Sequence, residues 1–383
     1  MNIFVIGRCL PEEKTGLIGL FEFEQAVALK KYGNNRVTYL FADNRSIKTL
    51  RKIGKKRCEI QGIQIYGTYL PVGGIPTACF NKIKYKQFQA TWKKAIQEQG
   101  EPDIVHVHFP LITTNDFLWN MWREYECQVI VTEHWSRVQN KTLRPCWQHM
   151  LERTMQEADA VICVSELLRE SMLELTGIQR KVYVIPNMVS DKFRYNRIAE
   201  SKSLKADDRF NFIAVARLVQ GKRMNQLIEA FSKAFLGEKK IQLTIVGDGP
   251  ERKKLQNKIE NLGIQKQIHL TGYLASDKVA ELMEQSDCFV SASVFETFGV
   301  PWVEAWCCGL PVIGMENGPI DDYFTPENSR KFIADNAESL QSAMMNIYKD
   351  RSKFNPKEIS ENAVSKFSAK AVAVQLEAIF NSL

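Results

Sequence analysis

The chain has 383 residues, of which 45% are apolar and 25% are charged. This length suits two domains rather than a single core, and the composition excludes a disordered or fibrous protein. No apolar stretch reaches the roughly 20 residues that a membrane-spanning helix needs, and the N-terminus lacks the features of a signal peptide. We therefore expect a soluble protein.

The net charge of +7 is unevenly distributed, because residues 1–100 contain 17 lysines and arginines against seven acidic residues. The cations gather in RKIGKKR (51–57) and at Lys82, Lys84 and Lys86. This pattern is typical either of a solvated surface or of a surface that attracts anionic lipid headgroups, phosphates or an acidic acceptor. No recognition motif for nucleic acid accompanies it, so we expect no nucleic-acid partner.

The nine cysteines form no C-x-x-C pair, and several lie in apolar segments. Such cysteines behave as small buried hydrophobes. We therefore expect a reduced, cytoplasmic protein without a disulfide framework or a structural zinc site.

Short apolar runs alternate with longer amphipathic ones, which predicts βαβ units around a parallel sheet. The first strand is predicted at 2–6, followed by a loop with Gly16 and Gly19 and a helix that Gly33 ends. Further strands are predicted at 37–42, 64–70, 103–109, 128–134, 160–165 and 182–187, and helices at 80–99, 114–125 and 145–157.

The polar segment 191–209 has no clear hydrophobic period and is the predicted linker. Beyond it the alternation restarts, with strands in FNFIAVAR, IQLTIVG, QIHLTGY and DCFVSAS and helices from about 223, from Pro250 and over 277–286. The stretch 356–383 has a helical pattern. The fold class is therefore α/β, with two Rossmann-like doubly wound domains that face each other across a cleft, at 1–190 and 210–360. Residues 361–383 would form a C-terminal helix that crosses back to the first domain.

The stretch FETFGVPWVEAWCCGLPV (295–312) predicts a turn that Gly299 relaxes and a helix that begins near Pro301. A helix N-terminus after a glycine-containing turn presents free N–H groups and a positive dipole end, which suit a diphosphate. Glu296 precedes the turn and Glu304 lies in the helix, and a carboxylate accepts hydrogen bonds from the paired hydroxyls of a ribose or hexose. A surface helix with two solvated glutamates is the alternative.

Other predicted strand-to-helix loops carry similar chemistry. Arg217 and Lys222 follow the first strand of the second half, GDGPER (247–252) follows the next, and TGY (271–273) follows a third. Because the carboxyl ends of parallel strands share one edge of a sheet, these cations can clamp a pyrophosphate near Glu296. The set indicates a nucleotide-sugar site.

The motifs R-L-x-x-x-K (217–222), G-D-G-P-E (247–251) and E-x₇-E (296–304) resemble those of a large family of retaining, nucleotide-sugar-dependent glycosyltransferases. This family has the GT-B fold and is called family 4, or glycosyl transferases group 1. The resemblance runs through most of the chain and is strongest over 209–313.

The resemblance implies a role for each matching residue of the second half. Arg217 and Lys222 would hold the diphosphate, Glu304 the ribose, and Glu296 the hydroxyls of the donor sugar. The remaining donor-site positions are the backbone around Phe298, Gly299 and Val300, the loop at Gly247, and Tyr273 beside the base.

In the first half, VSELLRE and VIPNMVSDKF match common family segments, and Asn187 is expected to shape a turn. TEHW places His134 at a strand end, where the family often has a histidine near the donor sugar; a structural role is the alternative. His106 and His108 are expected on one face, with His106 in the core. The first loop departs from the usual Gly-Gly, since Leu17 follows Gly16, and Gly16 is still assigned to the donor.

The resemblance implies transfer of a sugar, with retention, from a UDP- or GDP-sugar to a hydroxyl of a saccharide or lipid-linked saccharide, in polysaccharide or glycolipid biosynthesis. No D-x-D occurs, so we expect neither a metal nor another cofactor. The expected location is the cytoplasm, with an anionic surface at the inner face of the membrane as a possible partner. The alternatives are a non-catalytic sugar-nucleotide sensor, a GT-B epimerase or phosphorylase, and a dinucleotide-dependent oxidoreductase, against which the lack of G-x-G-x-x-G counts.

Overall fold

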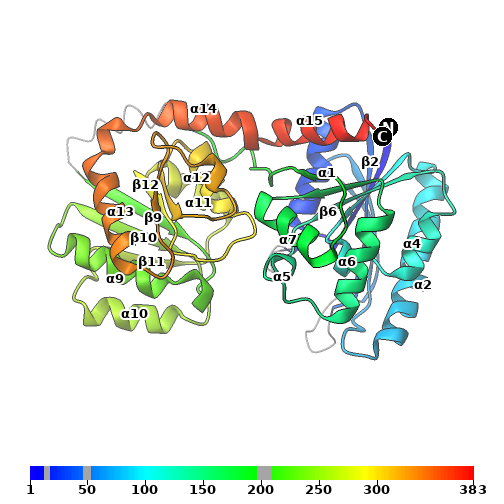
Figure 1. Cartoon of the computed structure of the whole chain (residues 1–383), viewed down its shortest axis with the longest axis horizontal. Helices are drawn as coiled ribbons and strands as arrows, with labels where there is room; N and C mark the ends of the chain where they lie inside the picture. Colours follow the sequence, from blue (N-terminus) through cyan, green and yellow to red (C-terminus); the bar gives the residue numbers. More distant parts are fainter. Residues whose placement is uncertain (13–17, 46–52, 196–208) are drawn as a thin grey trace. The chain divides into compact units, whose positions relative to one another are not determined.

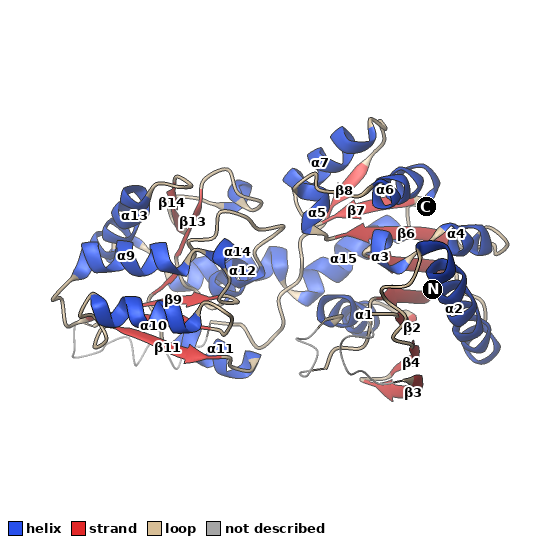
Figure 2. Ribbon diagram, turned by 90° about the horizontal axis from the view of Figure 1, so that it is seen from below, coloured by secondary structure: helices blue, strands red, loops and turns tan. Residues whose placement is uncertain are grey.

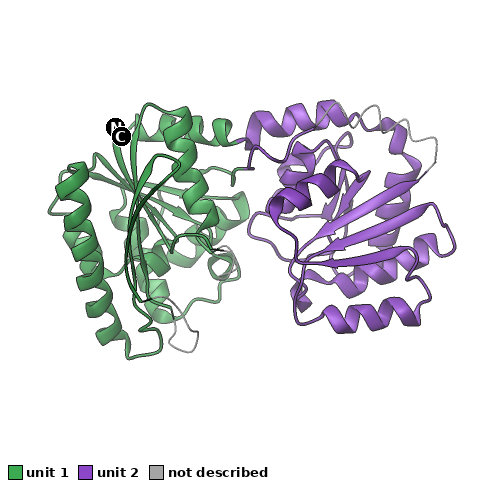
Figure 3. Ribbon diagram, turned by 180° about the vertical axis from the view of Figure 1, so that it is seen from behind, with its two compact units in different colours: residues 1–188, 369–383 green, residues 189–368 purple. Residues whose placement is uncertain are grey.

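The chain passes twice between two α/β units, which Figure 3 colours separately. The computed structural model describes residues 1–12, 18–45, 53–195 and 209–383. Unit 1 comprises Met1–Met188 and Ala369–Leu383, and unit 2 comprises Val189–Ser368. Gly16 and residues 196–208 of the predicted linker lie outside the described residues.

The sheet of unit 1 has the strand order β3-β4-β2-β1-β5-β6-β7-β8, and Figure 1 labels its strands β2 and β6. Of the described strands in this sheet, only β3 runs antiparallel to its neighbour. The strands are β1 Asn2–Gly7, β2 Arg36–Asp43, β3 Gly54–Ile60, β4 Ile63–Tyr69, β5 Ile104–His108, β6 Gln128–Glu133, β7 Ala160–Cys163 and β8 Val182–Val184.

Helices cover both faces of this sheet (Figure 2). On one face α1 and α15 share a core with β1 and β2 that includes Val5, Phe23 and Leu376. On the other face Phe4 of β1 meets Trp92 of α2 edge to face at 5.4 Å. The helices of unit 1 are α1 Leu20–Tyr32, α2 Thr77–Gln99, α3 Pro110–Thr113, α4 Asp116–Trp122, α5 Ser136–Gln139, α6 Pro145–Glu157, α7 Glu166–Thr176 and α15 Ala369–Phe380.

The sheet of unit 2 has the order β11-β10-β9-β12-β13-β14, and its paired strands are parallel. Its strands are β9 Phe210–Val215, β10 Ile241–Val246, β11 Ile268–Gly272, β12 Cys288–Val290, β13 Val312–Met315 and β14 Ser329–Phe332. Its helices are α9 Met224–Phe235, α10 Arg252–Asn261, α11 Ser276–Glu284, α12 Val300–Cys307, α13 Ala337–Lys349 and α14 Pro356–Phe367, with short 3₁₀ turns η2 Gln220–Lys222, η3 Asp321–Tyr323 and η4 Arg351–Lys353.

The C-terminal stretch differs from the single helix that its pattern predicts. Ser368 has extended backbone angles and separates α14, which packs on α12 in unit 2, from α15, which packs on α1 in unit 1. At the same junction the amide of Val189 donates to the carbonyl of Phe367 at 2.7 Å. The two crossings between the units therefore lie side by side.

The basic residues of the first half do not form one solvated face. Lys84 is buried, and its ammonium donates to the carbonyl oxygens of Ile112 and Thr114. Burial lowers the pKa of Lys84 to about 7. Residues 54–57 of the basic run lie in the edge strand β3, where Arg57 pairs with Glu98 at 2.6 Å. None of the described helices combines the length and apolarity that crossing a membrane requires.

Candidate functional site

The loops that follow β9, β10 and β11 are joined by backbone hydrogen bonds at the carboxyl edge of the unit 2 sheet. The amide of Leu218 donates to the carbonyl of Asp248 at 2.9 Å, and the amide of Glu251 donates to the carbonyl of Leu218 at 3.1 Å. The amide of Gly247 donates to the carbonyl of Gly272 at 2.9 Å. These bonds unite the three loops that the sequence assigns to the site.

Gly247 and Gly249 allow this close approach of the loops. A Cβ on Gly247 would lie 1.9 Å from the carbonyl oxygen of Ala216, and the backbone of Gly247 has a positive φ of 138°. A Cβ on Gly249 would lie 2.4 Å from the carbonyl oxygen of Leu218. Neither position accepts a side chain without displacement of the backbone that carries Arg217.

Lys222 and Glu296 connect this group of loops to the loop after β12. Strand β12 is the other neighbour of β9, and the ammonium of Lys222 forms an ion pair with the carboxylate of Glu296. The two side chains are 25% and 18% exposed, so the pair is accessible to a ligand at its surface. Arg217 is exposed on the β9 loop. The cations and the carboxylate therefore share one edge of the sheet.

Helix α12 begins at this edge directly after Gly299, whose φ is 88°. The ring of Trp302 packs closely against Gly299. A Cβ on residue 299 would lie 3.0 Å from a ring atom of Trp302. Val300 and Glu304 are half-buried on the helix, and the side chain of Phe298 is buried against Phe367. Backbone, rather than the Phe298 side chain, is therefore what this turn offers a ligand. Tyr273, after β11, is 58% exposed.

Unit 1 places a second set of polar residues at the carboxyl edge of its own sheet. Arg8 follows β1, and its guanidinium binds Glu22 of α1 at 2.6 Å. The same guanidinium lies 3.6 Å from the ring centroid of Phe109, which follows β5. The sequence offered no pattern that identifies Arg8, since a lone arginine after a strand is common.

His134 lies at the end of β6 and is 8% exposed. Its Nε2 shares a hydrogen bond of 3.0 Å with Nδ1 of His108, and its ring stacks on Phe109 at 4.7 Å. Burial lowers the pKa of His134 to about 3, so the imidazole is neutral. His106 is fully buried against Thr132, as the sequence predicts, and its ring lies on the same face as that of His108.

Glu133 is a further buried group that the sequence does not single out. Its Oε1 accepts the backbone N–H groups of His134 and Trp135, each at 2.8 Å. Burial raises the pKa of Glu133 to about 7. The carboxyl group therefore fixes the backbone turn that presents His134 and Trp135.

Two family models match the chain in succession. Residues 50–193 match the model described as Glycosyltransferase Family 4, and residues 196–366 match the model described as Glycosyl transferases group 1. The matches together run through most of both units. The chain belongs to the family 4, group 1 glycosyltransferases.

Curated relatives of this family are identical to the chain at about a quarter of the aligned positions. The gpi3 subunit of phosphatidylinositol N-acetylglucosaminyltransferase from Schizosaccharomyces pombe is 26% identical over 61% of this chain and 51% of its own length. The alpha-monoglucosyldiacylglycerol synthase of Streptococcus pneumoniae is 27% identical over 63% of this chain and 59% of its own length. The match thus spans only somewhat more than half of each relative.

A solved structure confirms the family's fold. HepE of Anabaena, crystallised with UDP, aligns over the whole of both chains with a TM-score of 0.76 and 18% identity. The predicted GT-B class with parallel α/β sheets is therefore correct.

Proposed function

We propose that the chain transfers a hexosyl group from a nucleoside diphosphate sugar to a hydroxyl acceptor. The observation that carries this proposal is the convergence of Arg217, Lys222, Glu296 and the N-terminus of α12 at one edge of the unit 2 sheet. Such an edge suits a ligand with a negatively charged diphosphate and several hydroxyls. HepE, which shares the fold, has been crystallised with UDP and with UDP-glucose, which supports a UDP-sugar donor, although a GDP-sugar has the same diphosphate.

The proposed chemistry is electrostatic. Cleavage of the anomeric bond leaves negative charge on the diphosphate, and Arg217, Lys222 and the α12 N-terminus stabilise that charge where it develops. This transfer requires no metal or other cofactor, because the protein supplies the positive charge. With retention of configuration, the leaving phosphate accepts the proton of the acceptor hydroxyl.

The donor's other groups have proposed partners as well. Glu304 binds the ribose hydroxyls, Glu296 the hydroxyls of the sugar, and Tyr273 and the loop at Gly247 border the base. The ion pair with Lys222 holds Glu296 in place before the donor arrives. His134, being neutral and buried, serves as a hydrogen-bonding group rather than as a charge.

We propose that the acceptor binds to unit 1, because the donor is assigned to unit 2. The name of the phosphatidylinositol N-acetylglucosaminyltransferase subunit contains a lipid, and the alpha-monoglucosyldiacylglycerol synthase is named for a glycolipid. We propose a saccharide or lipid-linked saccharide as the acceptor of this chain, in polysaccharide or glycolipid biosynthesis, and a cytoplasmic location at an anionic membrane surface.

Arg217→Ala tests the diphosphate clamp. We expect turnover of the accepted donor to fall by about 10²–10³, since one charge-stabilising group is lost from the transition state. Release of UDP or GDP from a panel of nucleotide sugars, with a mixed acceptor panel, measures this. Arg351→Ala, an exposed arginine on η4 in the same unit, is the matched control and should keep wild-type turnover.

Full turnover by Arg217→Ala would exclude the clamp. Donor binding by the wild-type chain without any release of nucleotide would instead support a sensor. Interconversion of two sugar nucleotides without an acceptor would support an epimerase.

A further inference from the structure

The segment that runs from the end of β6 through α5 into the first turn of α6 has an unusual composition. Residues 135–149 contain Trp135, Arg137, Lys141, Arg144 and Trp147 and no acidic residue. The segment leaves the sheet directly after His134, at the carboxyl edge of unit 1. A cationic and aromatic surface therefore borders the residues already described there.

The aromatic and cationic side chains of this segment form one cluster. The rings of Trp135 and Trp147 meet edge to face, with their centroids 4.7 Å apart. The guanidinium of Arg137 lies 5.6 Å from the centroid of Trp135 and 5.2 Å from that of Trp147, and Arg144 lies 5.1 Å from Trp147. Both tryptophans are half-buried and both arginines are exposed. The rings thus hold the two guanidinium groups in place at the surface.

The charges of Arg137 and Arg144 are not balanced by an ion pair with any carboxylate that the structure describes. Among the described residues, no carboxylate forms an ion pair with Arg137 or Arg144, whereas Lys141 of the same segment pairs with Glu174. A guanidinium that stacks on an aromatic ring keeps its in-plane N–H groups available. Those N–H groups match the two oxygens of a carboxylate or phosphate.

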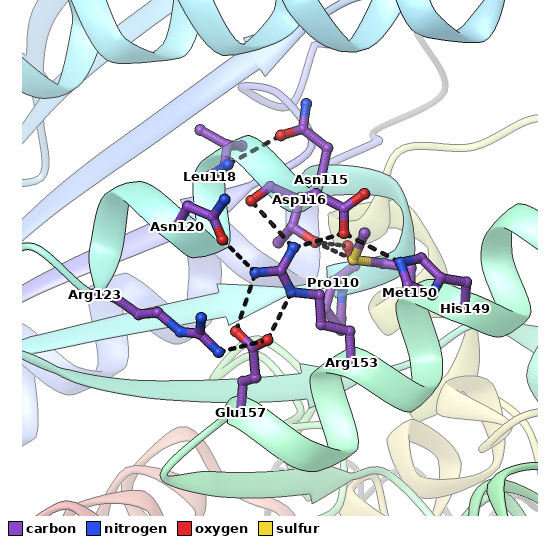
Figure 4. Close-up of polar contacts among 11 residues, drawn as sticks. Pro110, Asn115, Asp116, Leu118, Asn120, Arg123, His149, Met150, Arg153 and Glu157 are labelled. Atoms are coloured by element: carbon purple, nitrogen blue, oxygen red, sulfur yellow. Dashed lines mark hydrogen bonds and ion pairs between the residues drawn. The ribbon is translucent and has the colours of Figure 1, made fainter.

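The supports of the cluster are fixed on both sides. On one side, the carboxyl group of Glu133 accepts a hydrogen bond from the backbone N–H of Trp135. Helix α6, whose first turn carries Trp147, is tied to α4 by Arg153, which bonds Asp116 at 2.6 Å and Asn120 at 2.6 Å (Figure 4). The cluster is therefore preorganised, which lowers the entropy cost of binding a ligand.

We propose that Trp135, Arg137, Arg144 and Trp147 form a subsite for an anionic sugar, one that carries a carboxylate or a phosphate. The half-exposed indole rings offer apolar surface to the C–H groups of a pyranose, and the arginines bind its charged group. The subsite lies beside His134, so under the function proposed above the anionic sugar is part of the acceptor. The assignment of this sugar to the acceptor rests on the proposed function. The binding of an anionic sugar by the cluster does not depend on it.

Calorimetric titration of the full chain tests the subsite with defined probes. A hyaluronan tetrasaccharide supplies carboxylates, its carboxyl-reduced form is the neutral counterpart, and glucose 6-phosphate supplies a phosphate. We expect the wild type to bind the tetrasaccharide or glucose 6-phosphate and not the carboxyl-reduced form. Arg137→Gln should weaken that binding tenfold or more, because a charge-assisted contact is lost. Lys141→Gln removes an equal charge from the same segment and should leave the affinity unchanged.

Several results would overturn the inference. They are failure of the wild type to bind either anionic probe, equal binding of the neutral tetrasaccharide, and unchanged binding by Arg137→Gln with a wild-type melting curve. Phosphatidylglycerol vesicles test whether the anionic ligand is a lipid headgroup. If the wild type binds these vesicles but no soluble sugar, and Arg137→Gln loses vesicle binding, the cluster binds a membrane surface instead. Titrations of the same samples with UDP-glucose and GDP-glucose separate the two proposals. If the chain binds a nucleotide sugar but neither anionic probe, the subsite is rejected and the proposed function stands.

Discussion

The buried imidazoles of unit 1 connect single residues to the response of the fold to acid. Burial lowers the pKa of His106 and of His134 to about 3, and it holds that of His108 well below the usual range. In the unfolded chain these groups titrate near pH 6.5. As the pH falls below that value, the unfolded chain binds protons that the folded chain does not. Each imidazole therefore removes about 1.4 kcal/mol of stability per pH unit.

Between pH 6.5 and 5.0, we expect His106→Gln to reduce the acid-induced loss of unit 1 stability by about 2 kcal/mol. Hydrogen exchange of the β5 amides at the two pH values measures it. His269→Gln, at an exposed histidine of β11, is the control. Glu133 acts in the opposite direction, because its raised pKa lowers stability as the pH rises from about 4.5 to about 7. Glu133 is unchanged in both variants, so its contribution cancels from the comparison. An equal acid-induced loss of stability in the wild type and in His106→Gln would contradict the assignment of this effect to His106.

At the scale of elements, the loops of unit 2 show what a glycine contributes beyond flexibility. Gly249 lies where the β9 and β10 loops exchange backbone hydrogen bonds. Gly221 lies in η2, and no heavy atom lies within 4 Å of a Cβ placed there. The two positions form a natural pair for substitution, since alanine meets backbone at one and open space at the other.

Gly249→Ala should weaken binding of the donor nucleotide roughly tenfold. The added Cβ pushes apart the loops that carry Arg217 and Asp248, and such overpacking costs about 1–3 kcal/mol. Titration with UDP and GDP, together with the thermal unfolding midpoint, measures the effect. Gly221→Ala should match the wild type in both. If the two variants behaved alike, the contact between the loops would have no bearing on the site.

The sequence predicts most elements of both sheets, because their strands are short apolar runs and their helices have caps and periodicity. It misses the short strands β13 and β14 of unit 2. It also misses β3, whose Lys55 and Arg57 lie on an edge strand, where charged residues are tolerated and blunt further pairing. It also groups Lys84 with the surface lysines, since only the tertiary structure reveals the carbonyl groups that Lys84 binds. The unit 2 loops follow from motifs that are contiguous in sequence. The contacts of Arg8 and His108 do not, because they join residues from separate elements. Glu133 bonds the two residues that follow it, but only the tertiary structure shows that its carboxyl group is buried.

At the scale of the whole molecule, a short C-terminal helix completes a domain that begins more than 300 residues earlier. Val372, Leu376 and Phe380 of α15 belong to the same buried core as Ile3 and Val5 of β1. The hydrophobic contribution of these side chains is therefore made to unit 1, although the chain reaches them only after passing through unit 2.

Leu376→Ala should destabilise unit 1 by about 2–5 kcal/mol, the usual cost of a cavity at a fully buried leucine. Hydrogen exchange should accelerate in β1 and α1 and stay unchanged in β9 and β10. Val374→Ala, on the exposed side of the same helix, is the matched control. Faster exchange confined to unit 2 would contradict the assignment of α15 to unit 1.

The place of α15 has a consequence for how the protein is made. The ribosome synthesises β1 to β8 first, but that sheet lacks the side chains of Val372, Leu376 and Phe380 until the chain beyond unit 2 has been translated. Unit 2 is a continuous stretch and has no such delay. We therefore expect the second unit to reach its native state before the first, the reverse of the order in which translation normally completes domains. During that interval the apolar face that α15 will cover is open to chaperones.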